Sequence, residues 1–450
     1  MIQIITLLLG LFLTYNIFRS KANYIGLLWV IIAYLLINGD IFIIRVPFSI
    51  PILKWLIYSL LFIELIQMKK FKRNWKIFPF KKIITVLIIG SLLISFLDPR
   101  LSIFQKCYFP FEEITITYMV LFLGYITINS TKDLERLKKP MYYAIIIITL
   151  YGIFNFISGT NPYYRFVLDN FYEGGDVVLK SKLRAFDTTL DRFRGTSTFN
   201  LSFDYGYASS LIAIYFLYAL DDFRTSIAFI GIIAGLIGAV ICNSRTVFFA
   251  VIVAIGIYVF FATLNLAKIA KITFLIILIG IFSFSTIPVL QKSIDNTLDI
   301  FISGGDNVAG SSLMMRQIQL LGAVNYFLQS PIRGNGFKYI DNELGWGDRD
   351  NVAKSKMRGF ESIIYQFMIE QGLIGLVTKL IFLILLITYF LKKRKYSRNK
   401  NIAALGLAMT ILFIIFTIGT GPLRAWPLTM LFLGAIIKTI QLNEISNHNS

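Results

Sequence analysis

Charged residues are scarce in this chain. Asp, Glu, Lys and Arg together make up 15% of its 450 residues, whereas soluble domains carry roughly 25%. Hydrophobic residues make up 56%, and the mean hydropathy is +0.70. A water-soluble protein of this length has too little interior to hide so many apolar side chains. The composition therefore excludes a soluble protein and predicts an all-α polytopic integral membrane protein.

Residues that bind metals or carry redox chemistry are also nearly absent. The chain has one histidine, His448, close to the C-terminus, and two cysteines, Cys107 and Cys242, without metal-ligand or redox spacing. This excludes a catalytic histidine and a histidine-based metal site, so we expect no metal and no cofactor. The N-terminus lacks the basic region of a signal peptide, and the first apolar run is predicted to be a retained helix.

The net charge is nevertheless +19, which is a feature of nucleic-acid-binding proteins. The basic residues cluster in short segments between apolar runs, however, which is the pattern that holds loops in the cytoplasm during membrane insertion. We therefore expect a lipid bilayer as the partner of this chain and no nucleic acid.

Apolar runs of bilayer-crossing length divide the chain into about 13 predicted transmembrane helices. They lie at approximately 2–18, 24–37, 51–67, 83–97, 113–128, 141–157, 206–220, 227–242, 246–264, 272–288, 367–390, 402–418 and 427–440. The runs are interpreted as almost free of ionisable groups, with Lys54 and Glu64 as exceptions. Since ion-coupled transporters place carboxylates or histidines in mid-membrane, this pattern gives little support to a transporter.

The basic segments set the predicted orientation. The segments 68–82, 132–139 and 391–401 are rich in Lys and Arg and fall on one side, which we assign to the cytoplasm. The C-terminus is then cytoplasmic and the N-terminus external. Two long loops, 158–205 and 289–366, fall on the external face.

Part of the second loop is predicted to be helical. Apolar residues recur there near helical spacing, with polar residues between them, and Pro331 follows the pattern. We therefore expect an amphipathic helix at 312–329 that lies on the external membrane surface. Its apolar positions are Leu313, Leu320, Leu321, Val324, Phe327 and Leu328.

Arginines gather on the predicted external face, next to helix ends. Guanidinium groups bind phosphate through paired hydrogen bonds and stay charged in apolar surroundings, so the pattern predicts a site for an anionic lipid headgroup, above all a pyrophosphate. Arg245 stands out because a positive charge in a very short external turn opposes the usual charge bias of such turns. The alternative, that these arginines are solvated or paired with nearby acids, stays open. The candidates are Arg192, Arg194, Arg245, Arg316, Arg333, Arg349, Arg358 and Arg424.

Glu361 is the candidate catalytic acid or base. It lies where the second loop returns to the membrane, beside Arg358. Burial would raise the pKa of this carboxyl group, and the neighbouring arginine would lower it. The alternative is a salt-bridged loop carboxylate.

Several of these segments resemble a known family. The stretch 361–376, which begins Glu361-Ser362-Ile363-Ile364-Tyr365, is similar to the segment after the large periplasmic loop of O-antigen ligases and Wzy-type O-antigen or capsule polymerases. The stretch Ser330-Pro331-Ile332-Arg333-Gly334-Asn335-Gly336-Phe337 resembles the same family. The Arg194-Gly195 element and the Ser244-Arg245 turn resemble two further landmarks of it, and the likeness covers roughly residues 190–380.

The resemblance implies a metal-independent glycosyltransferase at the outer face of the bacterial cytoplasmic (inner) membrane. In such a protein Arg194 and Arg245 would hold the pyrophosphate of an undecaprenyl-diphosphate-linked oligosaccharide, which serves as donor and acceptor. Glu361 stands where ligases commonly carry a catalytic histidine, which favours a polymerase of oligosaccharide repeats over a ligase that transfers glycan to lipid A-core. Arg192, Arg316, Arg333 and Arg358 are further expected substrate contacts.

A flippase and a chain-length regulator are the expected protein partners of a polymerase of this kind. A lipid-linked glycan flippase or other transporter is the alternative from a different functional class.

Overall fold

A computed structural model describes most of the chain. The described residues are 2–20, 23–44, 50–171, 186–187, 192–220, 225–262, 313–344, 362–396, 399–421 and 425–448. The predicted span at 272–288 lies outside them, as do Arg349, Arg358, Glu361 and Arg424.

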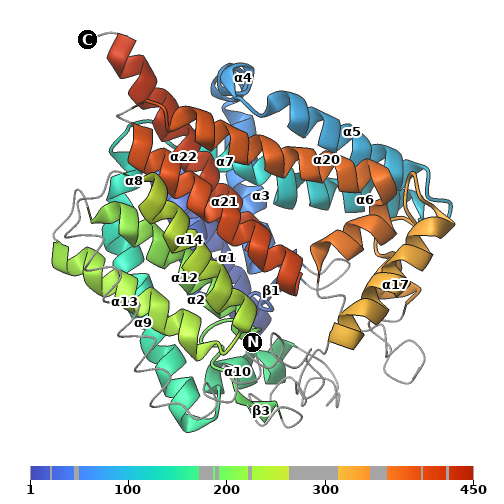
Figure 1. The fold of residues 1–450 in the computed structure, drawn as a ribbon, viewed down its shortest axis with the longest axis horizontal. Coiled ribbons are helices and arrows are strands. Elements are labelled where there is room, and N and C mark those ends of the chain that lie inside the picture. The colour runs from blue at the N-terminus through green and yellow to red at the C-terminus, as the bar shows by residue number, and fades with distance from the viewer. Residues whose placement is uncertain are drawn as a thin grey trace.

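The described chain is almost entirely helical (Figure 1). The helices are α1 (Ile2–Arg19), α2 (Tyr24–Leu36), α3 (Ile52–Ile66), α4 (Met68–Ile77), α5 (Lys81–Phe96), α6 (Ile103–Glu113), the π-helix η1 (Ile114–Met119), α7 (Val120–Ile126), α8 (Asp133–Arg136), α9 (Lys138–Ser158), α10 (Pro162–Phe171), α12 (Ser202–Ala219), α13 (Thr225–Ile241), α14 (Arg245–Phe261), α17 (Leu313–Gln329), α18 (Tyr339–Asn342), α20 (Ile363–Lys393), α21 (Lys400–Thr420) and α22 (Ala425–His448). The described chain also has four short strands in two antiparallel pairs: β1 (Phe42–Ile44) pairs with β2 (Ile50–Pro51), and β3 (Phe186–Asp187) pairs with β4 (Arg192–Phe193).

Five helical segments of the described chain are long and apolar enough to cross a membrane, which suggests a multi-pass membrane protein. They are Ile103–Ile126, Asp133–Ser158, Ile363–Lys393, Lys400–Thr420 and Trp426–Ser446. A sixth results if α4 and α5, which meet at an angle of 107°, form one span. Helices α1, α2, α13 and α14 are apolar but shorter than the roughly 20 residues that a span requires.

Large apolar side chains are exposed along the outer helices. On α9, the exposed residues Ile147, Leu150, Phe154 and Ile157 recur at helical spacing. A soluble protein rarely leaves an apolar stripe of this kind in water, and such stripes mark membrane or protein contacts.

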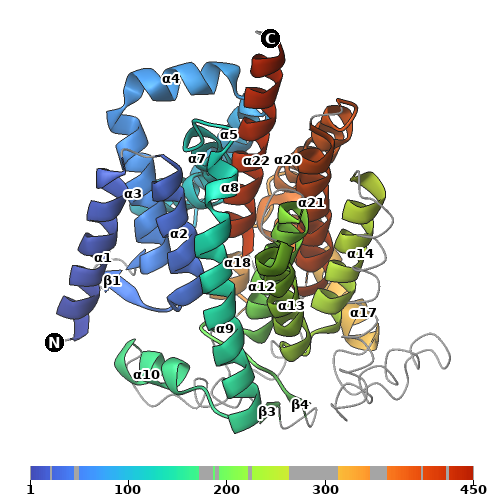
Figure 2. The same cartoon turned by 90° about the vertical axis from the view of Figure 1, so that its left-hand side faces the viewer.

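The two ends of the molecule carry different segments. In Figures 1 and 2, α4 and the C-terminus lie at one end, and the N-terminus, α10 and β3 lie at the opposite end. Helix α4 carries much of the basic segment 68–82, while α10 and β3 belong to the first long loop, 158–205.

The structure changes the predicted bounds of the fifth span. The helix begins at Ile103, not at residue 113, and runs through η1 to Ile126. Its start is fixed by a capping box, in which the Ser102 side chain accepts from Gln105 N and the Gln105 side chain accepts from Ser102 N. Lys106 and Glu112 interrupt the apolar pattern before residue 113, so the sequence alone suggests a loop there. In the structure Lys106 Nζ donates to Phe96 O and Glu112 pairs with Lys54.

Helix α20 is broken at Gly372, which has φ of 57° and ψ of −153°. The loop 330–336 docks onto this break and pairs with the backbone groups that the helix leaves open. Four hydrogen bonds join them: Asn335 N to Ile369 O (2.8 Å), Gly336 N to Glu370 O (2.9 Å), Leu373 N to Pro331 O (2.8 Å) and Ile374 N to Ile332 O (3.1 Å). Irregular backbone at membrane depth is tolerated only where the protein satisfies it in this way.

The docked loop predicts an intolerance of side chains at Gly334. This residue has φ of +74°, and a β-carbon there would lie 2.4 Å from the backbone nitrogen of Gln371. We expect Gly334→Ala to destabilise the protein by about 1–3 kcal/mol, measured by thermal unfolding in detergent.

The matched control is Gly256→Ala, because Gly256 lies within α14 and a β-carbon there meets no atom within 4 Å. This change is expected to stabilise by about 1 kcal/mol through helix propensity. Equal stability of the Gly334→Ala variant and the unmodified protein would contradict the docked loop.

Candidate functional site

A cavity of about 550 Å³ lies between the broken helix α20 and the helices around it. Its size is within the usual range for ligand pockets. The polar residues that line it are Asp40, Lys54, Glu112, Glu113, Thr117, Asn200, Asp204, Lys338, Gln366, Glu370, Gln371 and Lys379. Its aromatic residues are Tyr34, Phe42, Phe109, Phe199, Phe337 and Phe367.

A buried ion pair closes one wall of this cavity. Lys379 Nζ lies 2.7 Å from Glu113 Oε1 and donates to Gln371 Oε1 at 2.7 Å. Gln371 Nε2 in turn donates to Glu113 Oε1 at 2.7 Å, and Ser91 Oγ donates to the second Glu113 oxygen. The side chains of Lys379 and Glu113 are 2% and 12% exposed. The triangle ties α6 to both limbs of the broken helix, since Gln371 precedes Gly372 and Lys379 follows it.

The expectation that the apolar runs carry almost no ionisable groups is therefore wrong for α20. Glu370 and Lys379 both lie within the predicted span 367–390, and both are buried on the cavity wall. Ionisable residues within a membrane span are rare and mark functional sites. Both positions are visible in the sequence, but the pairing of Lys379 with Glu113 is not, because these two residues lie far apart along the chain.

A π-helical turn lies next to this pair. The chain passes from α6 into η1 directly after Glu113, and Pro110 one turn earlier lacks the N–H that a regular helix needs. One carbonyl of the wider turn, that of Thr117, accepts a hydrogen bond of 2.8 Å from Trp426 Nε1. Such turns occur frequently at functional sites.

Asn200 is the buried amide of the site. It is 8% exposed and lines the cavity, and neither its Oδ1 nor its Nδ2 has a hydrogen-bond partner within the described part of the chain. Leaving an amide buried without partners costs about 1–3 kcal/mol per group. A group bound in the cavity would remove this penalty.

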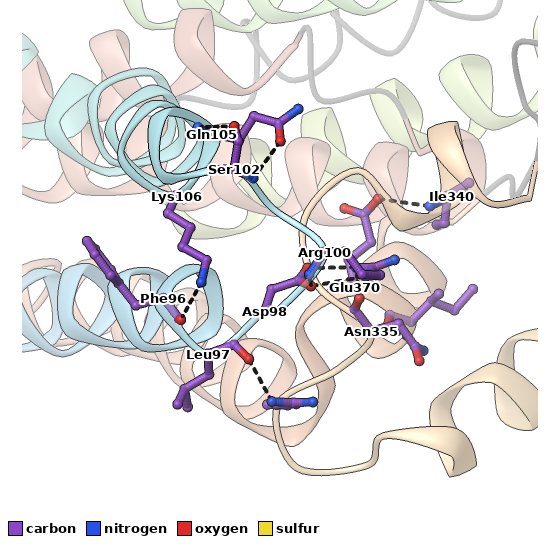
Figure 3. Close-up of polar contacts among 12 residues, drawn as sticks. Phe96, Leu97, Asp98, Arg100, Ser102, Gln105, Lys106, Asn335, Ile340 and Glu370 are labelled. Carbon is purple, nitrogen blue, oxygen red and sulfur yellow. Dashed lines mark hydrogen bonds and ion pairs between the residues drawn. The ribbon is translucent and has the colours of Figure 1, made fainter.

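Glu370 lies at the point where the loop 330–336 meets α20 (Figure 3). Its Oε1 accepts from Ile340 N at 3.4 Å, and its Oε2 accepts from Gln366 Nε2 at 3.3 Å. Both hydrogen bonds are long, and they orient the carboxylate on the cavity wall.

A second ion pair secures the docked loop from outside. Arg100 donates to Asp98 through Nε at 3.0 Å and through Nη2 at 2.7 Å, and Nη2 also donates to the carbonyl of Asn335 (Figure 3). The hydrogen bonds that Arg100 donates to Asp98 raise the pKa of its guanidinium group. The Arg100 guanidinium also lies 4.9 Å from the centre of the Tyr339 ring.

The structure brings Arg194 and Arg245 into one region. Gly195 N donates to Ile241 O at 3.1 Å, which places the Arg194 element against the turn that precedes Arg245. Both arginines are half-buried, and Arg194 Nε has no hydrogen-bond partner among the residues that the structure describes.

Among the other predicted arginines, Arg333 is the one whose side chain the structure describes. Arg333 is exposed, and its Nη1 donates to Leu97 O at 2.7 Å, at the end of α5. Arg192 lies in β4 and Arg316 in α17, and only their backbones are described. Arg358 and the predicted base Glu361 lie outside the described residues.

The first turns of α12 connect the arginine region to the cavity. Asp204 lines the cavity, and Gly206, two residues later, packs against Cys242 and Val247 on either side of the Arg245 turn. Neither Arg194 nor Arg245 is among the described residues that line the cavity. The site therefore has two neighbouring parts, a cationic region and a cavity rich in carboxylates.

No protein-family model matches the chain, and no curated protein matches it. Within the described ranges, no group of three His, Cys, Asp or Glu side chains is placed to hold a metal ion.

The buried pair predicts a large penalty for removing one partner. We expect Lys379→Met or Glu113→Gln alone to destabilise the protein by about 3–5 kcal/mol, because each leaves the other polar group buried without its partner. The double variant is expected to recover a large part of this loss. Thermal unfolding of the four proteins of the double-mutant cycle gives the coupling.

The matched control is the exposed pair Arg165 and Asp169, whose atoms lie 3.9 Å apart and whose side chains are 76% and 65% exposed. Solvent screens this pair, so its coupling is expected to stay below about 1 kcal/mol. A Glu113–Lys379 coupling no larger than that of the control would contradict the buried network.

Proposed function

We propose that this chain is a membrane glycosyltransferase that polymerises undecaprenyl-diphosphate-linked oligosaccharide repeats for a surface polysaccharide, either O-antigen or capsule. The proposal rests on one observation above the others: Arg194 and Arg245, which the family resemblance singles out, lie in adjacent segments joined by the Gly195 N–Ile241 O hydrogen bond. Two arginines on adjacent segments suit a pyrophosphate, which carries several negative oxygens.

The proposed setting is the bacterial cytoplasmic membrane, with the basic segments inside and both long loops outside. The separation of α4 from α10 and β3 supports this orientation (Figure 2). Helix α17 supports a position at the outer membrane surface, because its apolar residues Leu321 and Leu328 are 64% and 65% exposed while Gln319 and Ala323 are buried against the protein.

The proposed chemistry is a displacement at the anomeric carbon of the donor sugar. A hydroxyl oxygen of the acceptor sugar forms a bond to that carbon, and the bond between the carbon and the diphosphate oxygen breaks. The diphosphate leaves with the bonding electron pair, and Arg194 and Arg245 stabilise its charge. The hydroxyl proton passes to a carboxylate. Glu361 is the candidate from the sequence, and Glu370 is the candidate on the cavity wall.

A lipid-linked glycan flippase is the second candidate. The buried Glu113–Lys379 pair beside a broken helix favours it, because transporters use discontinuous helices and intramembrane charges to form their binding sites. A flippase would move a lipid-linked repeat across a bilayer without lengthening it.

Reconstitution separates the two candidates. We expect the purified chain in proteoliposomes to convert an undecaprenyl-diphosphate-linked oligosaccharide repeat into a ladder of longer products on a gel. Arg194→Ala and Arg245→Ala are expected to lower the rate of extension by about 10²–10³-fold, and the lysine variants less, since lysine keeps the charge but loses the paired hydrogen bonds.

Arg165→Ala is the matched control, because Arg165 is an exposed arginine of α10 in the first long loop, outside both parts of the site. Its rate of extension should equal that of the unmodified protein. Normal ladders from both alanine variants would refute the arginine assignment, and movement of the lipid without any extension would identify the flippase.

A further inference from the structure

The side chain of Asn200 is the feature of the cavity that points most directly to a ligand. The residue is 8% exposed and lines the cavity, and neither Nδ2 nor Oδ1 has a hydrogen-bond partner within the described part of the chain. Its amide offers donors on the nitrogen and an acceptor on the oxygen, side by side in one plane. A buried amide without partners is unfavourable, so a ligand that pairs with both atoms would gain that free energy on binding.

The backbone around Asn200 is held firmly in place. Thr198 Oγ1 donates to Leu35 O at 2.6 Å, and Ser197 Oγ donates to Ile148 O at 2.6 Å. Ser197 also has φ of 50°, a left-handed conformation that is unfavourable for serine. Such conformations persist where surrounding contacts impose them, and they cluster at ligand-binding sites. The segment therefore presents the Asn200 amide to the cavity in a fixed position.

Two neighbouring hydroxyl groups on a sugar ring match this amide. One hydroxyl oxygen accepts a hydrogen bond from Nδ2, and the other hydroxyl donates to Oδ1. A single hydroxyl cannot lie in line with both atoms, because hydrogen bonds weaken steeply away from linearity. An acetamido group reaches one atom only, since its planar trans amide directs the N–H and the C=O to opposite sides.

The rest of the lining suits the ring of a sugar. Phe199, Phe337 and Phe367 lie on the same cavity as Asn200. Ligand sites combine apolar and aromatic walls with a few fixed polar groups in this way. A sugar has both matching surfaces, since its ring carries C–H faces and its edge carries hydroxyl groups.

Asn200 also links the cavity to the arginine region. It lies six residues after Arg194 in the same segment, and six residues span at most about 20 Å even when fully extended. A turn closed by Phe199 N and Thr196 O at 3.0 Å shortens this segment. A sugar on Asn200 would therefore lie near a diphosphate held at Arg194.

We propose that this cavity binds a sugar of the repeat through two neighbouring ring hydroxyl groups, and that Asn200 is the residue that binds the pair. The saccharide class rests on the proposed function, whereas the requirement for two adjacent polar groups follows from the amide itself. Sugars whose adjacent hydroxyls are absent or substituted are rejected, because they leave one atom of the buried amide without a partner.

The test compares isomeric sugars with the purified full chain in nanodiscs. The probes are the methyl 3-deoxy and 6-deoxy hexosides of the gluco, galacto and manno series. Loss of the hydroxyl at carbon 3 removes every adjacent pair of ring hydroxyls, whereas loss of the hydroxyl at carbon 6 keeps them. In at least one series we expect the 6-deoxy isomer to bind with a Kd at least about fivefold lower, measured by NMR titration. Equal Kd values in all three series, or no binding of any probe, would overturn the proposal.

Asn200→Leu tests the residue, because leucine has a similar size and no polar atoms. The preference for the 6-deoxy isomer is expected to disappear, so that the ratio of the two Kd values falls to about one. The Tm of the ligand-free chain is expected to rise by about 1–3 °C, because the variant no longer buries an amide without partners. An unchanged preference would place the hydroxyl pair elsewhere, and a lower Tm would show that the amide is structural; either result would refute the site.

Asn155→Leu is the matched control. Asn155 is a buried asparagine that does not line the cavity, and its Nδ2 donates to Thr160 O at 3.1 Å. Loss of this hydrogen bond is expected to lower the Tm and to leave the preference for the 6-deoxy isomer unchanged. Loss of the preference in this variant as well would show that it does not depend on Asn200 and would count against the site.

The outcomes distinguish this proposal from the proposed function. Ladders of extended product from a chain that shows no preference between the isomers would refute the cavity proposal alone. A preference that Asn200→Leu removes, in a chain that extends no lipid-linked repeat, would refute polymerisation and leave the cavity as a saccharide site.

Discussion

The docking of loop 330–336 onto the break in α20 is the interaction on which the cavity depends. A helix broken at Gly372 leaves backbone groups without partners inside the helix, and the loop pairs with them through four hydrogen bonds. The break also sets the positions of Glu370 and Gln371 on one limb and Lys379 on the other. Gln371 and Lys379 thus reach Glu113 from opposite sides of the break.

The buried Glu113–Lys379 pair positions neighbouring segments more than it stabilises the fold. A buried ion pair contributes little net stability, because desolvation offsets the attraction between its partners. Glu113 and Lys379 are therefore poorly explained as a stabilising device alone. Their position explains them better, because the pair holds α6 against a bent helix and keeps a polar cavity open between apolar segments.

The sequence predicts the class of the fold better than its details. Composition alone predicts a helical membrane protein, and the ranges of α9, α13 and α21 follow from their apolar runs to within a few residues. The start of the helix at Ile103 was missed because Lys106 and Glu112 interrupt the apolar pattern, although the Ser102–Gln105 capping box is a local signal for it. Four apolar helices of the described chain, α1, α2, α13 and α14, are shorter than a bilayer crossing requires, so the number of 13 spans stays a prediction.

The site shows the same division between local and long-range information. Arg194 and Arg245 could be singled out because each lies next to a helix end, which is a local signal. The cavity could not, because its residues come from segments spread from Asp40 to Lys379 and no spacing relates them. Charged residues inside an apolar run are nevertheless a signal in the sequence, and Lys379 carries it. Such a residue needs a partner, and the structure supplies it as Glu113, the first residue of the predicted span 113–128.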